Sequence, residues 1–299
     1  MSESTETAAL VALLRSGNRP WGVYADLVEN AGSALAILRD ELTETTGQDS
    51  LFETEDPGVG ERPRIDAAAA DIGRWSKEGI RLLTLLDADY PENLRAVHDR
   101  PPLIFVAGQL QPADAHSVAV VGARRATPAG VSRARAIARH LAERGYTVAS
   151  GLAAGIDTAA HSAALSSGGR TIAVIGTGLH RSFPPENAAL QRRIAAQCAV
   201  VSQFWPDAPP TRRTFPMRNA TMSGLALATV IVEAAQTSGS RMQARLALEQ
   251  GRPVFLLDSL LEQEWARAFA RRPGIQVVSS PGEITTAVER LTSSDALVA

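Results

Sequence analysis

The stretch SVAVVGARRATPAGVSRARAIARHLAERG, residues 117–145, decides the fold. It begins with a continuous apolar run, which is typical of a strand that is buried on both faces of a parallel sheet. A helical pattern follows, with Pro128 near its start and Gly145 at its end, the positions that these residue types favour. The stretch therefore predicts a strand, a connecting loop and a helix, which is the repeating unit of an α/β protein.

The alternation of strands and helices continues toward the C-terminal end of the chain. Further strands are expected in the apolar segments TVAS, TIAVIG, CAVVS, ATVIVEA, RPVFLL and IQVVSS. Helices are expected between them, near residues 186–196, 220–227 and 239–250, and a long loop is expected over 206–219. The pattern predicts a parallel sheet that is covered by helices on both faces.

The N-terminal part of the chain has a different character. Residues 1–48 carry apolar side chains at helical spacing, which predicts a small helical domain. Residues 49–64 are acidic and rich in Gly and Pro, so a linker is expected there. Residues 65–299 would then form the α/β domain, beginning with a helix over 65–80 and a short strand over 101–108.

Composition narrows the class of protein. No apolar run reaches the roughly 18 residues that a membrane span requires. The acidic, polar start MSESTETAAL lacks the features of a secretory signal, so we expect a cytoplasmic protein without a membrane partner. Cys198 is the only cysteine, which excludes an intrachain disulfide and a cysteine-based zinc site. We expect no metal ion and no cofactor.

The charged residues are distributed unevenly along the chain. The formal net charge is −2, yet residues 117–253 contain 16 Arg against 6 acidic residues. Lys77 is the only lysine, so an anion in this basic block would be held by Arg side chains or by backbone N–H groups.

Glycines, small hydroxyls and arginines follow the expected strands. Because ligands of parallel sheets bind beyond the carboxyl ends of the strands, these segments would converge on one edge. Their composition suits phosphate, since glycines allow close approach to the backbone and Arg supplies paired donors. Neither a P-loop nor a G-x-G-x-x-G pattern is present, so ATP or NAD binding is not indicated. The candidate residues of these segments are Gly122, Arg124, Arg125, Ser150, Gly151, Gly155, Arg181, Ser238, Gly239, Ser240 and Arg241.

Asp157 and His161 lie four residues apart and would share one helix face. They form either a general acid/base pair or a structural support, with Asp157 capping the helix that follows Gly155. We favour the second interpretation because no nucleophile or group of metal ligands accompanies the pair. Glu233, at the end of VIVE, is a further candidate for supporting the site. No catalytic residue is expected.

The segment TFPMRN, residues 214–219, has the composition of a nucleic-acid contact. An aromatic ring at Phe215 can stack on a base while Arg218, beside Asn219, binds the phosphate. Phe183 is a second candidate platform, and packing in the core is the alternative for either ring.

Several of these segments resemble, in the same order, the motifs of the bacterial DNA-processing protein A family, also called DprA or Smf. They extend from about Leu82 to Leu256, more than half of the chain. The matching segments are LLTLLDADYPENLRAVHDRPPLIFVAGQL, VAVVGARRATPAG, SGLAAGIDTAAHSAAL, TIAVIGTGLHRSFPPEN, FPMRN and VIVEAAQTSGS. The resemblance implies an extended Rossmann-like fold, with a parallel or mixed sheet and helices on both faces, behind a small helical (SAM-like) domain.

The resemblance also implies single-stranded DNA binding without catalysis. Members of the family dimerise and help to load a RecA-type recombinase onto DNA strands taken up during transformation. The pocket for DNA phosphates would be formed by Gly122, Arg124, Ser150, Gly151, Gly155, Arg218, Asn219, Ser238, Gly239 and Ser240.

The sequence departs from the family pattern at several points. Ala220 stands where the family has a second Arg, and SGSRMQA, residues 238–244, replaces a segment that usually reads SGSLITA. Arg241 of this segment would restore the missing positive charge. One more strand and helix are expected where relatives have a winged-helix tail. A sensor or processing enzyme for a free nucleotide, on a related scaffold, remains the alternative function.

Overall fold

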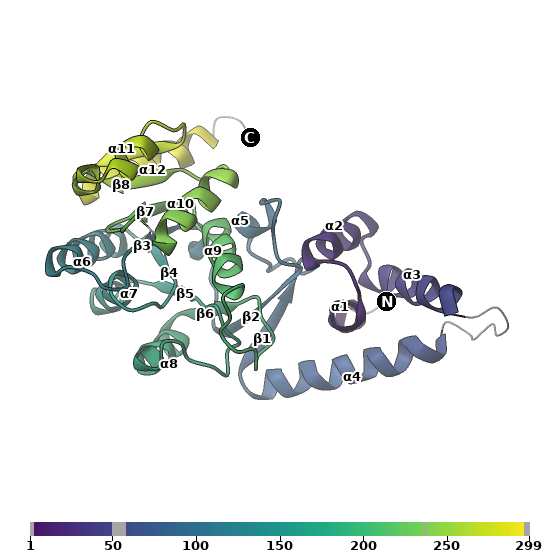
Figure 1. Cartoon of the computed structure of the whole chain (residues 1–299). Helices are drawn as coiled ribbons and strands as arrows, with labels where there is room; N and C mark the ends of the chain where they lie inside the picture. Colours follow the sequence, from purple (N-terminus) through teal and green to yellow (C-terminus); the bar gives the residue numbers. More distant parts are fainter. Residues whose placement is uncertain (1–2, 50–57, 237, 296–299) are drawn as a thin grey trace. The chain divides into compact units, whose positions relative to one another are not determined.

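The computed structural model describes residues 3–49, 58–236 and 238–295 (Figure 1). The chain divides into two compact units. The first comprises Met1–Tyr90 and Asp99–Ile104, and the second comprises Pro91–His98 and Phe105–Ala299. The expected helical region lies in the first unit, and the expected alternation of strands and helices lies in the second.

The first unit is mainly helical. Its described elements are α1 (Glu3–Ser16), α2 (Trp21–Ala31), α3 (Ala34–Asp49), α4 (Gly58–Lys77) and β1 (Ile80–Thr84). The Glu6 carboxylate on α1 accepts hydrogen bonds from the N–H groups of Ala34 and Leu35 at 2.7 and 3.1 Å. This carboxylate therefore satisfies two of the free donors at the start of α3 and favours its positive end.

Helix α4 begins inside the segment 49–64 that we expected to be a linker. Its first described turns are held by Glu61, which forms an ion pair with Arg39 of α3 at 2.8 Å. Residues 50–57 of the expected linker lie outside the described residues.

The described residues form a nine-stranded sheet in the order β1-β2-β6-β5-β4-β3-β7-β8-β9. β2 pairs with β6 antiparallel. Each neighbouring pair in the series β6-β5-β4-β3-β7-β8-β9 is parallel, so the sheet is mixed. The strands after β1 are β2 (Leu103–Gly108), β3 (Ser117–Val121), β4 (Thr147–Ser150), β5 (Thr171–Val174), β6 (Ala199–Ser202), β7 (Ala228–Ile231), β8 (Val254–Leu257) and β9 (Ile275–Val278).

Helices cover both faces of the sheet. From β3 the chain proceeds to β4, β5 and β6 on one side, and from β7 it proceeds to β8 and β9 on the other. Right-handed crossovers in opposite directions place their helices on opposite faces. The helical elements of this unit are α5 (Glu92–Arg95), η1 (Pro112–His116), α6 (Pro128–Glu143), α7 (Ile156–Ser166), η2 (Pro185–Asn187), α8 (Ala188–Gln197), α9 (Thr214–Leu225), α10 (Gly239–Glu249), η3 (Asp258–Glu262), α11 (Glu264–Phe269) and α12 (Pro281–Asp295).

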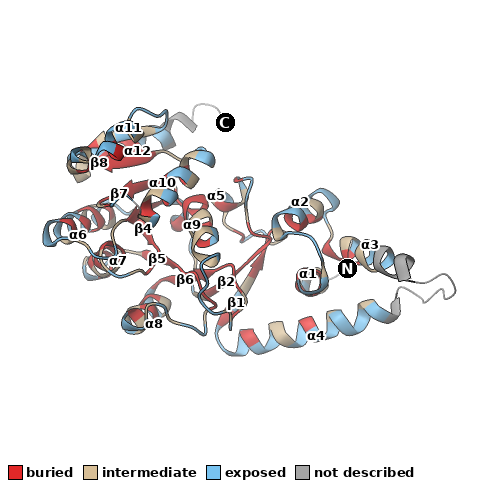
Figure 2. Ribbon diagram, in the orientation of Figure 1, coloured by how far each residue is buried: buried red, intermediate tan, exposed pale blue. Residues whose placement is uncertain are grey.

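The central strands are the core of the second unit. Every residue of β3, β4, β5, β6, β7 and β8 is buried (Figure 2), as the continuous apolar runs predict. Ile137 of α6, Ile156 of α7 and Val288 of α12 share one apolar cluster with residues of β3, β4, β7 and β8. The added strand β9 and helix α12 form where the sequence predicts one more strand and helix.

The strand order places a crevice at the carboxyl ends of β3 and β7. These neighbouring strands are the point from which the two series of crossovers diverge. The loops that leave them run in opposite directions, and the space between such loops is the usual ligand site of an open α/β sheet.

Helix α9 begins earlier than the sequence pattern indicates. It starts at Thr214, so the expected loop over 206–219 is shorter and the helix expected near 220–227 is longer. Pro216 is the third residue of α9. Proline is tolerated in the first turn because the backbone N–H that it lacks would have no helical partner there.

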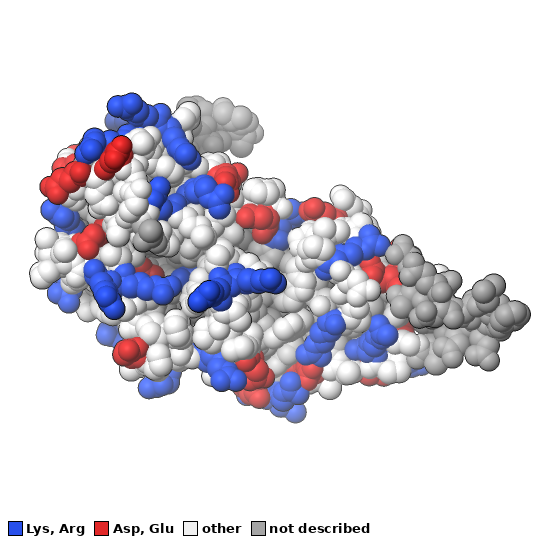
Figure 3. All heavy atoms as spheres, viewed as in Figure 1, with Lys and Arg blue, Asp and Glu red and all other residues white. Residues whose placement is uncertain are grey.

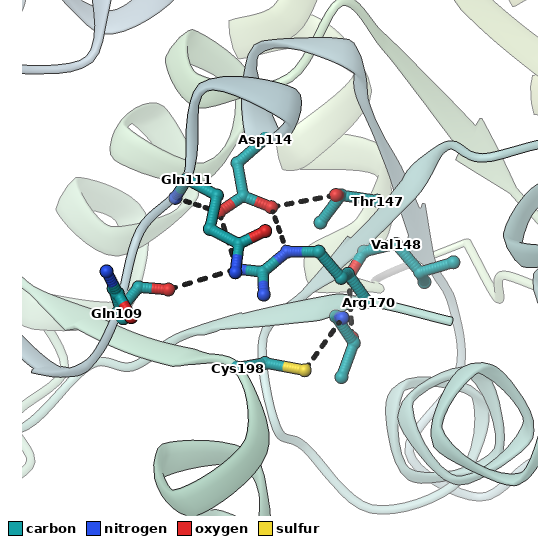
Figure 4. Close-up of polar contacts among 8 residues, drawn as sticks. Gln109, Gln111, Asp114, Thr147, Val148, Arg170 and Cys198 are labelled. Carbon is teal, nitrogen blue, oxygen red and sulfur yellow. Dashed lines mark hydrogen bonds and ion pairs between the residues drawn. The ribbon is translucent and has the colours of Figure 1, made fainter. Parts of the chain in front are cut away.

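An ion-pair network fixes the opposite edge of the sheet, where β4 and β5 begin (Figure 4). The buried Asp114 carboxylate of η1 accepts hydrogen bonds from the Thr147 hydroxyl at 2.8 Å and from Arg170 Nε at 2.9 Å. Arg170 also donates to the backbone carbonyl of Gln109 at 3.0 Å. The network ties η1 and the residue after β2 to the amino-terminal ends of β4 and β5.

Three structural facts concern the cysteine, metal binding and membrane spans. Cys198 is buried and accepts a weak hydrogen bond from the Thr171 N–H at 3.5 Å, which is the environment of a structural thiol. Within the described ranges, no three His, Cys, Asp or Glu side chains lie close enough to hold a metal ion. No described helix combines the length and the apolar character that crossing a membrane requires.

Candidate functional site

A cavity of about 540 Å³ occupies the crevice at the ends of β3 and β7. Its wall combines the loop after β3, the first half of α9 and the start of α10. In the view of Figure 3, basic side chains gather around α9 and the start of α10. The structure brings ten of the predicted residues into this wall: Gly122, Arg124, Arg125, Asp157, Phe215, Arg218, Asn219, Ser238, Gly239 and Ser240.

Arg218 places a buried positive charge in the cavity wall. The residue is only 6% exposed, and its Nη1 donates to the Val174 carbonyl at the end of β5, at 3.0 Å. Its guanidinium lies against Gly151, where any Cβ would overlap Nη1. Gly151 is therefore required to make room for Arg218, and it does not itself line the cavity. The pKa of Arg218 is lowered overall, because burial lowers it by more than the negative charge of the nearby Asp157 raises it.

Asp157 is directed at the backbone of its own loop. Its Oδ2 accepts hydrogen bonds from the N–H groups of Gly151 and Ala153 at 3.1 and 3.3 Å. The pKa of the carboxyl is raised overall, because burial raises it by more than the positive charge of Arg218 and these backbone donors lower it. A carboxylate engaged in this way organises the loop after β4.

His161 is fully buried beneath the same loop. Its Nδ1 lies 2.7 Å from the Thr171 hydroxyl, which in turn lies 2.6 Å from the Val148 carbonyl. Burial lowers the pKa of the imidazole to about 3, and the positive charge of Arg218 contributes to the decrease. The ring is therefore neutral at physiological pH. It does not line the cavity.

The loop after β4 has a backbone that few residue types can adopt. Gly155 has φ 78° and ψ −119°, and a Cβ there would collide with the carbonyls of Ala123 and Arg124. The Ile156 N–H donates to the Ala123 carbonyl at 3.2 Å. Leu152 also has a positive φ, 56°. The loops after β3 and β4 are thus locked together, with Gly155 at their closest approach.

Aromatic side chains stand beside the arginines at the cavity. The Arg124 guanidinium lies 5.4 Å from the centroid of the Phe215 ring, within cation–π distance. Phe183 meets Phe215 with ring centroids 5.6 Å apart and is 39% exposed. A Cβ on Gly176 would lie 2.9 Å from the Phe215 ring, so this glycine lets the ring rest on the end of β5. Phe183 is exposed and Phe215 is half-buried, so the pair is not packed in the core.

Helix α10 directs its N-terminus at the cavity. Ser238 is the N-cap, and its hydroxyl accepts from the Ser240 N–H at 3.2 Å. The start of a helix carries a partial positive charge and free N–H groups, which favour an anion. Arg124, Arg218 and this helix end therefore make the cavity electropositive.

Besides Gly151, Gly155 and His161 of the β4–α7 region, the predicted residues Ser150, Arg181, Arg241 and Glu233 also lie outside the cavity wall. Ser150 is buried and donates to the Val120 carbonyl at 2.7 Å, inside the sheet. Arg181 follows β5, two strands away from β3, and its Nε donates to the Asp207 carbonyl at 3.3 Å. The Arg241 guanidinium stacks 4.9 Å from the Trp265 ring in a separate hollow and does not replace the missing pocket charge. Glu233 instead accepts from the Thr127 hydroxyl at 2.7 Å, at the start of α6.

The cavity wall also contains residues that the sequence did not single out. Arg212, Met222, Met242 and Gln243 belong to this group. Arg212 belongs to the basic segment before α9, so the charge pattern was an available signal. Gln243 carries no such signal, since an isolated glutamine in a helix is ordinarily a surface residue.

Comparisons with known proteins show the family of the chain. The family model described as DNA recombination-mediator protein A matches residues 81–286. The chain belongs to the DNA recombination-mediator protein A family. The match covers the strands β2 to β9 and therefore the whole cavity wall.

Individual relatives support the assignment to the DNA recombination-mediator protein A family. Protein Smf of a Synechocystis strain is 40% identical over 238 residues, which are 78% of this chain and 58% of Smf. The chain thus spans somewhat more than half of the length of that relative.

Solved structures in the family also match. DNA processing protein A of Streptococcus pneumoniae is 29% identical, with a TM-score of 0.69 over 95% of each chain. The protein from Helicobacter pylori is 26% identical, with a TM-score of 0.62 over 72% of this chain and 96% of that one. The latter structure is described as showing a single-stranded DNA binding mode of that protein.

Proposed function

We propose that this chain binds single-stranded DNA as a non-catalytic mediator of recombination. The observation that carries the proposal is the convergence of Arg124, Arg218 and the N-terminus of α10 on one cavity, beside the Phe183–Phe215 pair. The site offers donors for phosphate on one side and aromatic faces for bases on the other. Single strands expose both groups, whereas a duplex hides its base faces.

Phosphate binding would use two kinds of donor. Arg124 and Arg125 are exposed, so their side chains are free to contact an anion that enters from solvent. The buried Arg218 and the N-terminus of α10 contribute positive potential from fixed positions in the cavity wall. A preorganised site of this kind binds phosphate independently of sequence. Ser238 and Ser240 add hydroxyl donors at the same end of α10.

The relatives support the same function. The Helicobacter pylori protein is described by its single-stranded DNA binding mode, and its structure matches 72% of this chain. By the same resemblance we propose a RecA-type recombinase as the protein partner, DNA taken up in transformation as the substrate, and a homodimer as the assembly.

The absence of catalysis is part of the proposal. Asp157 accepts hydrogen bonds from backbone N–H groups of its own loop, and His161 is buried beside Thr171 and does not line the cavity, so the two do not form an acid/base pair facing a ligand. The arrangement supports binding and delivery of DNA without bond cleavage.

Fluorescence anisotropy with a labelled oligo-dT of about 20 nucleotides tests the proposal. Arg124→Ala should weaken binding by roughly tenfold and reduce the slope of log affinity against log salt by about one. Arg133→Ala, an exposed Arg of α6 that does not line the cavity, is the matched control and should keep the wild-type affinity. Equal losses in the two variants would show that net charge alone, and not the cavity, determines binding.

A free nucleotide is the alternative ligand. The volume of about 540 Å³ lies within the range of small-molecule sites, which is the observation in its favour. Calorimetry with a panel of mononucleotides separates the two functions. Micromolar binding of a mononucleotide, without binding of oligo-dT, would favour the alternative.

A further inference from the structure

A second hollow lies beside the start of α10, outside the cavity at the ends of β3 and β7. Its volume is about 360 Å³, and its wall combines the start of α10 with α11 and the segment that follows α11. The wall residues are Gln236, Arg241, Glu264, Trp265, Ala268, Phe269 and Arg272. The two arginines and two aromatic rings of this wall take no part in the wall of the first cavity.

Each arginine of the hollow lies over one of the aromatic rings. The Arg241 guanidinium is 4.9 Å from the centroid of the Trp265 ring, and the Arg272 guanidinium is 4.8 Å from the centroid of the Phe269 ring. Trp265 and Phe269 are four residues apart on α11, and their ring centroids are 6.3 Å apart. One short helix therefore positions both guanidinium groups over neighbouring rings.

This stacking leaves donors of both arginines available. The N–H groups of a guanidinium lie in the plane of the group, so a ring against one face does not occupy them. Nη1 of Arg241 donates to the Gln236 carbonyl, which fixes the side chain at a second point. The Arg272 guanidinium forms no hydrogen bond or ion pair with any described residue.

The charge of the hollow favours an anion. Glu264 also lines the wall, yet among the described residues it forms no ion pair with either Arg241 or Arg272. Two positive groups and one negative group leave the wall with a net positive charge. Phosphate oxygens suit the paired donors of a guanidinium, and an arginine that is already stacked loses little side-chain freedom on binding. The hollow therefore has the chemistry of a phosphate site.

The hollow adjoins the first cavity across the first turn of α10. Arg241 lies between Ser240 and Met242, both of which line that cavity. Consecutive Cα atoms are about 3.8 Å apart, so the two binding surfaces are close neighbours on the same helix. In the view of Figure 3, basic side chains lie around the start of α10 and over α11. A strand longer than the cavity can hold would pass this turn as it leaves.

We propose that the second hollow binds a phosphate of the strand that leaves the cavity, with Arg241 and Arg272 as the donors. The proposal rests on the proposed function, because a free nucleotide offers the same phosphate chemistry. It lengthens the binding surface from the cavity to α11. Arg241 stands where the family pattern SGSLITA has Leu, so the added contact would be particular to chains with this replacement.

Anisotropy with a labelled oligo-dT of about 20 nucleotides tests the proposal on two adjacent residues of equal charge. Arg271 and Arg272 are both exposed, and only Arg272 lines the hollow. Arg272→Ala should weaken binding by roughly fivefold and reduce the slope of log affinity against log salt by about one. Arg271→Ala is the matched control and should stay within about twofold of the wild type.

A second pair of variants predicts a change of the opposite sign. Glu264→Gln removes the negative charge of the wall and should strengthen binding of oligo-dT by about twofold to threefold. Glu262→Gln, at an exposed position outside the wall, removes the same charge and should leave the affinity unchanged. Tighter binding cannot arise from misfolding, so this pair remains informative if an arginine variant is unstable.

Calorimetry with dTMP distinguishes a phosphate of the strand from that of a free nucleotide. Arg272→Ala should leave the binding of dTMP as it is in the wild type. A loss for dTMP without a loss for oligo-dT would overturn this inference alone, and so would equal affinities of the Arg272 and Arg271 variants for oligo-dT. Failure of the wild type to bind oligo-dT would overturn the proposed function, and this inference with it.

Discussion

The buried imidazole of His161 makes a quantitative prediction about stability and pH. Burial lowers the pKa of the folded state to about 3 from an ordinary value of 6.5. Below pH 6.5, His161 is therefore protonated in the unfolded chain but stays neutral in the folded chain. The free energy of unfolding that is present at neutral pH is lost as the pH falls toward 3. Between about pH 6 and pH 4 this single group should lower the free energy of unfolding by about 2.5 kcal/mol.

Replacing His161 with Gln removes the titrating group and should flatten this dependence. Hydrogen exchange of peptides from β4 and α7, corrected for the intrinsic effect of pH, measures the free energy of opening in the affected region. The wild type should lose about 2.5 kcal/mol more than the variant between about pH 6 and pH 4.

The same substitution at His116, which is exposed, is the matched control and should retain the wild-type dependence. The reasoning is refuted if His161→Gln loses stability as steeply as the wild type. It is also refuted if the ring signals of His161 titrate near pH 6.5 in the folded protein.

Three further substitutions test the support of the site and its binding face. Gly155→Ala should lower the free energy of unfolding by about 3 kcal/mol in thermal denaturation, because the new Cβ would meet the Ala123 carbonyl in a backbone conformation reserved for glycine; an unchanged melting temperature would contradict this. Asp114→Ala should cost about 3 kcal/mol in the same assay by leaving Arg170 without its carboxylate, whereas a loss below about 1 kcal/mol would mean that water replaces the pair. Phe215→Ala should weaken binding of oligo-dT by about 1–3 kcal/mol in anisotropy titrations, and unaltered affinity would exclude stacking on this ring.

The strands could be predicted from the sequence because their burial has a direct signature. A strand covered on both faces has few polar positions, so apolar runs such as VAVV and VIV stand out from the surrounding sequence. The start of α9 was harder to predict, since Pro216 reads as a helix breaker unless it lies in the first turn. Its true position depends on tertiary packing, which a local pattern does not contain.

The candidate site was predicted in part for a similar reason. Segments after strands could be recognised, but their neighbours depend on strand order, which becomes visible only in the folded sheet. Arg181 was included because it follows a strand, yet β5 lies two positions from β3. Arg241 was included for its charge, yet its guanidinium stacks on Trp265. Arg272 could not be found from sequence because its position over the Phe269 ring is a property of the packed structure.

The most direct test of the central claim is the salt dependence of binding to one oligo-dT and to its matching duplex. If the cavity holds phosphates of a single strand while the aromatic pair stacks on its bases, affinity for the single strand should exceed that for the duplex at every salt concentration. Both affinities should fall steeply as salt rises. Equal affinity for the two forms, or no measurable binding of the single strand at low salt, would contradict the account.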